Sequence, residues 1–200
     1  MANDQIFETV VTTCSAAGVV HVAPMGVRYV ESPAGPRVVV KPFRPSTTLD
    51  NLLATRTAVL NLTTDVRVFA GCVTGRRDWP VLPASGPGEP AAVHLASALE
   101  HALLHVEAVE DDAERVTLSM AVVRTGRHAS FRGFNRAQAA VVEGAVLVSR
   151  LRMLPPEKVA TEMAYLQIAI DKTAGEAERE AWGWLQDAVA AHAARTRAAA

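Results

Sequence analysis

Cysteine is scarce in this sequence, and the usual cysteine patterns are missing. The two cysteines among 200 residues, Cys14 and Cys72, form no CxxC pair and stand beside no group of histidines. This excludes a disulfide framework and a cysteine zinc site, and it favours a reducing, cytoplasmic location. The basic residues Arg76 and Arg77 follow Cys72 closely in sequence, but a nucleophilic role would need a histidine brought in by the fold. Both thiols are therefore predicted to be small buried side chains.

The sequence also lacks an excess of charge and long apolar runs. Its 20 basic and 21 acidic residues leave a net charge of −1, which disfavours general binding to nucleic acid or anionic lipid. No segment approaches the roughly 20 apolar residues that span a bilayer, and the first residues lack the basic start of a signal peptide. We therefore expect no nucleic-acid partner and no membrane partner.

Common catalytic motifs are missing as well. The sequence contains no GxSxG, no GxGxxG and no GxxxxGK[ST], which removes the usual sequence arguments for a hydrolase, a Rossmann enzyme or a P-loop ATPase. Because no self-sufficient catalytic constellation is visible, no catalytic residue is assigned.

What the sequence does contain in residues 1–130 is the pattern of an antiparallel barrel or curled sheet. Runs rich in β-branched residues alternate with turn-forming glycine and proline; they occupy residues 6–13, 19–22, 27–30, 37–41, 58–62, 105–108 and 115–123. Pro24 and Gly26 are expected to interrupt regular pairing. Asp112 and Glu114 belong to an acidic cluster expected at a solvated hairpin tip.

A glycine- and proline-rich stretch at residues 71–90 is predicted to be a long loop. Arg76, Arg77 and Trp79 in this loop are candidates to cover a bound ligand or to steer an anionic one. Among the histidines, His101 and His105 are spaced to share a face and could bind a metal ion. They lack a third ligand, which His94 could supply only through the folding of the chain, so no metal site is assigned.

From residue 131 onward the pattern becomes helical. Three helices are expected, at residues 135–151, around 159–170 with Gly175 ending the helix, and from about 176. We expect this region, residues 131–200, to pack on a barrel domain of residues 1–130. The joining segment at residues 131–136 carries two phenylalanines and Asn135, which fits either a ligand cleft or a hydrophobic staple with a helix cap.

The segment between residues 41 and 51 is the most informative in the chain. It places two cations and three hydroxyls where a strand ends and a helix begins; these are Lys41, Arg44, Ser46, Thr47 and Thr48. Helix N-termini present unpaired N–H groups and partial positive charge, which suits a phosphate. Alternatively, one hydroxyl only caps the helix and the cations are solvated.

Five segments together resemble the flavin-reductase-like FMN-binding split barrel, in order and spacing as well as composition. They read ETVVTT at residues 8–13, VAPMGV at 22–27, KPFRPSTTLDNL at 41–52, VLNLTTD at 59–65 and FNRAQAAVVEGA at 134–145. The last segment and the helical end resemble a poorly characterised branch of archaea and methylotrophic bacteria, in which a helical hairpin follows the barrel.

This resemblance implies a homodimer with FMN in a groove at the interface. The flavin ring would be held by the loop of Pro24, Met25, Gly26 and Val27. The phosphate would be held by the segment from Arg44 through Ser46, Thr47 and Thr48. Because these three hydroxyl residues include no basic residue, Lys41 or Arg44 must supply the charge. The resemblance also places Asn61 near the cofactor.

The implied activity is that of an oxidoreductase in which hydride passes through flavin N5, from NADH or NADPH to a small-molecule acceptor. For the methylotroph branch, the resemblance implies a pterin acceptor in tetrahydromethanopterin-linked one-carbon metabolism. Two alternatives stay open, since fold alone does not decide function. One is a non-catalytic flavin- or pterin-binding protein, and the other is an interaction protein that has lost the cofactor.

Overall fold

A computed structural model describes residues 5–33, 35–111 and 115–198 of the protein. The chain divides into two compact units, one from residues 1–63 and 78–130 and the other from residues 64–77 and 131–200. Among the described residues, every helix is too short or too polar to cross a membrane. Each unit is described below by itself.

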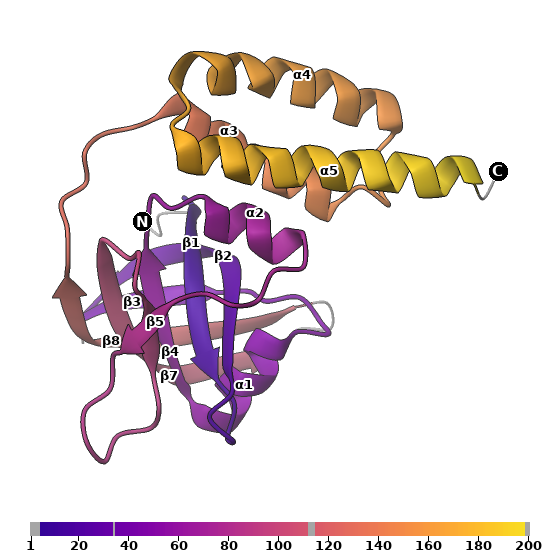
Figure 1. Ribbon diagram of the computed structural model, residues 1–200. Coiled ribbons are helices and arrows are strands. Elements are labelled where there is room, and N and C mark those ends of the chain that lie inside the picture. Colours follow the sequence, from indigo (N-terminus) through magenta and orange to yellow (C-terminus); the bar gives the residue numbers. More distant parts are fainter. Residues whose placement is uncertain (1–4, 34, 112–114, 199–200) are drawn as a thin grey trace. The chain divides into compact units, whose positions relative to one another are not determined.

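The first unit is a closed antiparallel barrel (Figure 1), which confirms the predicted fold class. Its strands follow the order β1, β2, β3, β8, β7 and β4 around the barrel. The bounds are β1 Phe7–Cys14, β2 Val20–Ser32, β3 Gly35–Val40, β4 Thr57–Leu62, β7 Glu100–Asp111 and β8 Val116–Arg127. The residues Asp112 and Glu114, predicted at the tip between β7 and β8, lie outside the described residues.

Side chains that alternate along the strands fill the interior of the barrel. Val11, Leu60, Leu104 and Met120 are buried in one cluster, as expected when every second residue of a strand faces the same side. Helix α1 (Thr47–Thr55) contributes Leu49 and Leu52 to this cluster.

Strand β2 runs without a break through Pro24 and Gly26, so the predicted interruption of pairing is wrong. Pro24 pairs with Val10 of β1, and Gly26 pairs with Glu8. A proline needs no donor at the edge of a sheet, and among the described strands only β1 pairs with β2 before Val27. The missing N–H of Pro24 is therefore tolerated.

The prediction of one long loop at residues 71–90 is also wrong. Helix α2 (Arg67–Val73) includes the first of these residues, and β5 (Val81–Pro83) lies within the rest. Strand β5 pairs with β6 (Val93–Leu95). Beneath this hairpin, Val59, Ala84, Ala92 and Leu103 form a second apolar cluster. The composition of this stretch indicated a loop, whereas its contacts give parts of it regular secondary structure.

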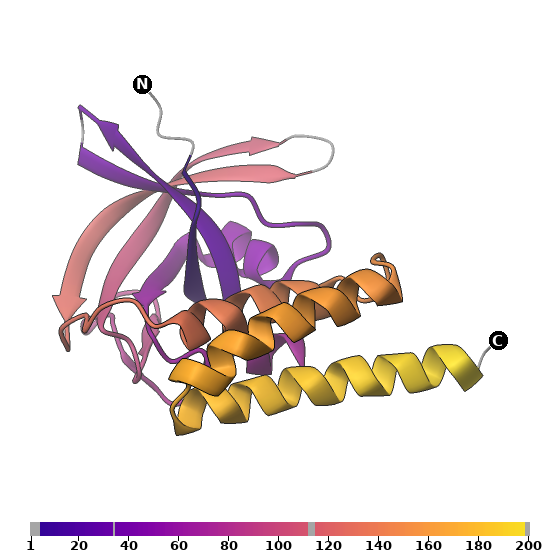
Figure 2. The same ribbon diagram turned by 90° about the horizontal axis from the view of Figure 1, so that it is seen from above.

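The second unit is helical, as predicted for the C-terminal region. It contains α2 together with α3 (Arg136–Ser149), α4 (Pro156–Thr173) and α5 (Glu176–Ala198). Figure 2 shows the last three helices from above, with α3 packed against both α4 and α5 and α2 packed against α3 and α5. Helix α4 ends at Thr173, two residues before the predicted Gly175, which does not adopt the left-handed conformation.

Asn135 caps α3 as predicted, since its side-chain oxygen accepts from Ala137 N and Gln138 N. The hydrophobic staple expected together with this cap does not form, because Phe134 is 100% exposed and makes a ring contact with Phe131 instead. The start of α3 therefore depends on polar side chains, since Ala137 N also donates to Thr173 Oγ1 at 3.1 Å.

A close approach between α3 and α5 provides a prediction on stability. A Cβ on Gly144 would lie 2.8 Å from Trp182 Cζ3 and 3.0 Å from Leu185 Cδ1. Trp182 is buried and donates to Gln167 Oε1 at 2.7 Å, so it cannot yield easily. We expect Gly144→Ala to destabilise the protein by about 1–3 kcal/mol, although alanine is the better helix former.

Gly183, also in a helix of this unit, is the matched control. A Cβ there would meet nothing within 4 Å, so Gly183→Ala should stabilise the protein by up to about 1 kcal/mol. Urea unfolding followed by circular dichroism measures both variants. If the two substitutions changed the free energy of unfolding in the same direction, the close packing at Gly144 would not be what requires glycine.

Candidate functional site

The segment predicted to hold a flavin ring, Pro24–Val27, lies in β2 where the pairing with β3 begins. Strands β2 and β3 pair from Val27 with Val40 to Ser32 with Gly35, so β2 has an open edge before Val27 within the described residues. In an antiparallel ladder, successive residues direct their backbone groups to opposite sides. Since Pro24 has no N–H for β1, Pro24 and Gly26 direct their backbone groups to this open edge.

The predicted phosphate-binding segment begins directly after β3, beside the same stretch of β2. Val40 is the last residue of β3, so Lys41 enters the loop beside the open edge of β2. Arg44 is about half exposed and forms an ion pair with Asp111, with 2.7 Å between Nη2 and Oδ1. Strand pairing therefore brings Lys41 close to the Pro24–Val27 stretch.

Helix α1 begins as the sequence predicts. Ser46 is its N-cap, and the Ser46 hydroxyl accepts from Leu49 N at 3.3 Å. The first intrahelical bond runs from Asp50 N to Ser46 O, so the N–H groups of Thr47 and Thr48 precede it and are not needed within the helix. Such N–H groups at the start of a helix can donate hydrogen bonds to an anion.

The predicted ligands in this segment differ in exposure. Lys41, Arg44 and Thr47 are exposed, Ser46 is half-buried, and Thr48 is buried. Two exposed cations, one exposed hydroxyl and two first-turn N–H groups form a donor set that suits a phosphate dianion. The chemistry of these residues therefore fits the phosphate of FMN.

Asn61 lies in a different environment. It is completely buried, and its Oδ1 accepts from Leu95 N at 2.8 Å. Its Nδ2 lies 3.1 Å from Val10 O, 3.2 Å from Val59 O and 3.3 Å from Thr12 Oγ1. Val10 pairs with both Pro24 and Asn61, so a single strand separates Asn61 from the predicted ring-binding stretch. Its polar atoms join β4 to β1 and β6.

The three residues proposed to cover a ligand are divided between the two units. Arg76 and Arg77 belong to the helical unit, where Arg76 stacks 3.8 Å from the centre of the Trp184 ring and Arg77 Nη1 donates to Cys72 O. Trp79 belongs to the barrel unit. Its Nε1 is buried and has no hydrogen-bond partner among the described residues.

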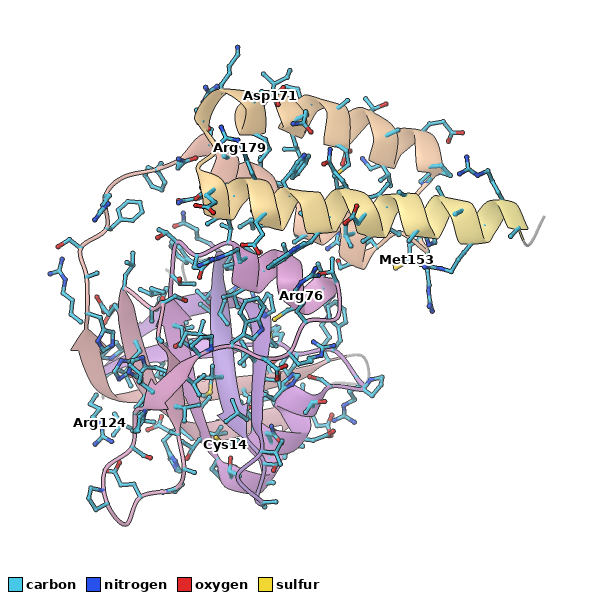
Figure 3. The ribbon with its side chains drawn as sticks, viewed as in Figure 1. Cys14, Arg76, Arg124, Met153, Asp171 and Arg179 are labelled. Atoms are coloured by element: carbon cyan, nitrogen blue, oxygen red, sulfur yellow. The ribbon has the colours of Figure 1, made fainter. Side chains whose placement is uncertain are left out.

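Both cysteines are buried, as predicted. Burial raises the pKa of the Cys14 thiol, which makes the thiolate scarcer at neutral pH. Cys14 is labelled among the side chains of the barrel in Figure 3.

A cluster of three histidines lies on the outer face of the barrel. One ring nitrogen from each of His94, His101 and His128 lies within 4.8 Å of the others, and this is the one such cluster of possible metal ligands found in the described part of the chain. The rings stack on one another, with centres 4.4 Å apart for His94 and His101. Burial, then the nearby histidines and Arg124, lower the pKa of His101 to about 4.

His101 and His105 share the outer face of β7, as expected, because Ala102, Leu104 and Val106 belong to the barrel core. They are not brought together in one cluster, since His101 is buried beside His94 and His128 whereas His105 is exposed. Sequence reasoning missed His128, because 27 residues separate it from His101 and only the pairing of β7 with β8 brings them together.

Two family models match this chain in order. A model described as the N-terminal domain of a protein of unknown function, DUF447, matches residues 7–129. A second DUF447 model matches residues 135–187. No curated protein sequence matches the chain.

Several solved structures resemble the protein. An FMN-bound DUF447 protein from Methanosarcina mazei is 18% identical, with a TM-score of 0.77 over 94% of this chain and 96% of that one. The 2-nitrobenzoate 2-nitroreductase of Pseudomonas fluorescens is 14% identical, with a TM-score of 0.52 over 63% of this chain and 66% of that one. A flavoredoxin from Methanosarcina acetivorans is 11% identical, with a TM-score of 0.51 over 64% and 74%. These likenesses confirm the split-barrel fold.

Proposed function

Because the chain belongs to the DUF447 family, we propose that it is an FMN-binding protein that acts as a flavin-dependent oxidoreductase. The observation that carries this proposal is the likeness, along nearly its whole length, to a DUF447 protein that was crystallised with FMN. The donor set at the start of α1 supports it independently, since that set suits the phosphate of the same cofactor.

Each part of the predicted site has a distinct task in this proposal. Lys41 and Arg44 neutralise the phosphate, and the Thr47 hydroxyl with the first N–H groups of α1 donates hydrogen bonds to it. Arg44 must leave Asp111 to do so. Exposed ion pairs contribute little to stability, so this exchange costs little.

The open edge of β2 provides the second part. Backbone N–H and C=O groups near Gly26 can pair with the polar edge of a flavin ring, as they would with a neighbouring strand. Pro24, Met25 and Val27 hold this stretch in place through their positions in β2, where Val27 is buried in the core and Thr9 Oγ1 donates to Met25 O.

A bound flavin would supply the redox chemistry, accepting hydride at N5 from NADH or NADPH and passing it to a small-molecule acceptor. The residues of this chain bind and orient the cofactor and limit the access of water to it. A pterin of one-carbon metabolism belongs among the acceptors to be screened.

We propose that the functional form is a homodimer with FMN at its interface. Ile6 and Phe7 at one end of the β1–β2 hairpin, and Val19 and Val20 at its other end, are between 38% and 66% exposed. Exposed apolar side chains along one hairpin offer positions for a protein interface. Light scattering of the flavin-loaded protein would give the mass of the assembly.

The visible absorption spectrum of the purified protein tests cofactor binding. FMN is added, unbound flavin is removed by gel filtration, and the spectrum is recorded before and after denaturation. We expect a yellow chromophore that stays with the protein and is released as FMN on denaturation. NADH and NADPH are then screened for bleaching without oxygen. Absence of retained flavin at high added FMN would contradict the proposal and favour an interaction protein, whereas bound flavin that no donor reduces would favour a carrier.

A further inference from the structure

We propose that His94, His101 and His128 form a binding site for a divalent zinc ion, with the fourth position open to water or to an oxygen of a small ligand. Three histidines and one exchangeable position are a known zinc arrangement. The site is separate from the phosphate segment and does not depend on the binding of FMN.

The tautomer of His94 is the one that a metal ligand needs. Its Nδ1 lies 2.8 Å from Leu95 O, and since a carbonyl can only accept, Nδ1 carries the proton. The lone pair of a neutral His94 ring is therefore on Nε2. Histidines that bind metals commonly donate their other N–H to a backbone carbonyl in this way, which holds the ring and its tautomer.

A ring nitrogen of His101 faces a ring nitrogen of His128, and the two nitrogens are nearly as far apart as two ligand atoms bound to one zinc ion. Their facing nitrogens, His101 Nδ1 and His128 Nε2, are 2.8 Å apart and share one proton in a hydrogen bond. Two nitrogens bound to zinc at 2.0–2.1 Å with tetrahedral angles are about 3.3 Å apart. Replacing the shared proton by an ion needs a separation of about half an ångström and a change of tautomer in one ring. It also needs the rings to turn, because His94 lies face to face with the other two rings at 4.4 Å and each imidazole binds a metal in its own plane.

The surrounding chain brings the three residues together. Gly126 pairs with His101 across β7 and β8, and a Cβ on Gly126 would lie 2.5 Å from His101 Cε1. Gly126 does not have a positive φ, so glycine here provides space for the imidazole. On the other side, His128 N donates to Leu99 O at 2.8 Å, which fixes the backbone of His128.

The cluster joins three separate segments, and solvent can reach it. His94 comes from β6, His101 from β7, and His128 follows β8. His94 and His101 are buried whereas His128 is exposed, which leaves a direction from which an ion and its fourth ligand can enter. The nearby cation, Arg124 (labelled in Figure 3), is ion-paired with Glu89 and donates to Ala84 O, so its charge is partly compensated.

Zinc titration calorimetry on the untagged, full-length protein tests the proposal after treatment with a chelator. We expect one zinc ion per chain. His128→Ala should weaken binding by at least about 100-fold, since the loss of an outer partner of a metal ligand alone costs 10–100-fold. Because His128 is exposed, this variant is expected to fold, which circular dichroism would check.

His105→Ala is the matched control, since His105 lies on the same strand but is exposed and outside the cluster. It should bind zinc like the wild type. Zinc should also raise the melting temperature of the wild type and of His105→Ala, but not that of His128→Ala. Absence of zinc binding by the wild type, or equal binding by the wild type and His128→Ala, would overturn the proposal.

Discussion

Arg44→Ala is expected to weaken FMN binding by about 10- to 100-fold and to leave riboflavin binding unchanged. A hydrogen bond to a charged group contributes about 1.5–3 kcal/mol, and each 1.4 kcal/mol is about tenfold in affinity. Riboflavin lacks the phosphate, so its affinity does not depend on the Arg44 guanidinium. Flavin fluorescence titrations with the two ligands measure the difference.

The exposed ion pairs of the barrel provide controls for Arg44→Ala. Arg37 pairs with Glu107 much as Arg44 pairs with Asp111, so Arg37→Ala removes a comparable arginine from outside the predicted site. It should bind both flavins normally. Asp111→Asn frees Arg44 and should not weaken FMN. Equal losses of FMN and riboflavin in Arg44→Ala would show that Arg44 is not a phosphate ligand.

Asn61→Ala is expected to destabilise the protein by about 3 kcal/mol or more. A buried polar group that loses its partner costs about 1–3 kcal/mol, and the side chain of Asn61 serves Leu95 N and the carbonyls of Val10 and Val59. Chemical unfolding followed by circular dichroism would give the change in the free energy of unfolding.

Asn51→Ala is the comparison for Asn61→Ala. Asn51 is also buried, and its Nδ2 donates to Thr13 Oγ1 at 3.0 Å, so we expect the loss of this hydrogen bond to cost about 1 kcal/mol. An Asn61→Ala protein as stable as the wild type, but with weaker flavin binding, would make Asn61 a cofactor contact and not a structural crosslink.

Local sequence signals were sufficient to predict where several elements begin. The hydroxyls before Leu49 predicted the start of α1, and Asn135 predicted the start of α3, because a cap satisfies N–H groups within the next three residues. The β-branched runs predicted the strands for a similar reason, since side-chain alternation depends only on neighbours. The resemblance based on those segments is confirmed at the level of fold and family. The individual flavin contacts stay predictions.

Signals from single residues failed where pairing decided the outcome. Pro24 was expected to break β2. It does not, because no described strand pairs with β2 on the side opposite β1 at this position, so the missing N–H of Pro24 costs no ladder hydrogen bond. His101 and His105 share a face as expected, but His101 meets His94 and His128 whereas His105 stays exposed, because only His101 lies beside β6 and the end of β8. Residues 71–90 were expected to be a loop, but α2 extends to Val73, and the segment after β5 packs through Ala84 against Val59 and Leu103.

The sequence by itself determined the barrel, the helical end and the group of cations and hydroxyls after residue 40 that suits a phosphate. Each of these depends on residues close together along the chain. Only the tertiary structure decided which distant residues meet. Strand pairing placed Lys41 beside the open edge of β2, buried Asn61 between three strands and gathered His94, His101 and His128. Such meetings depend on strand register, where a shift of one residue turns every following side chain to the opposite face.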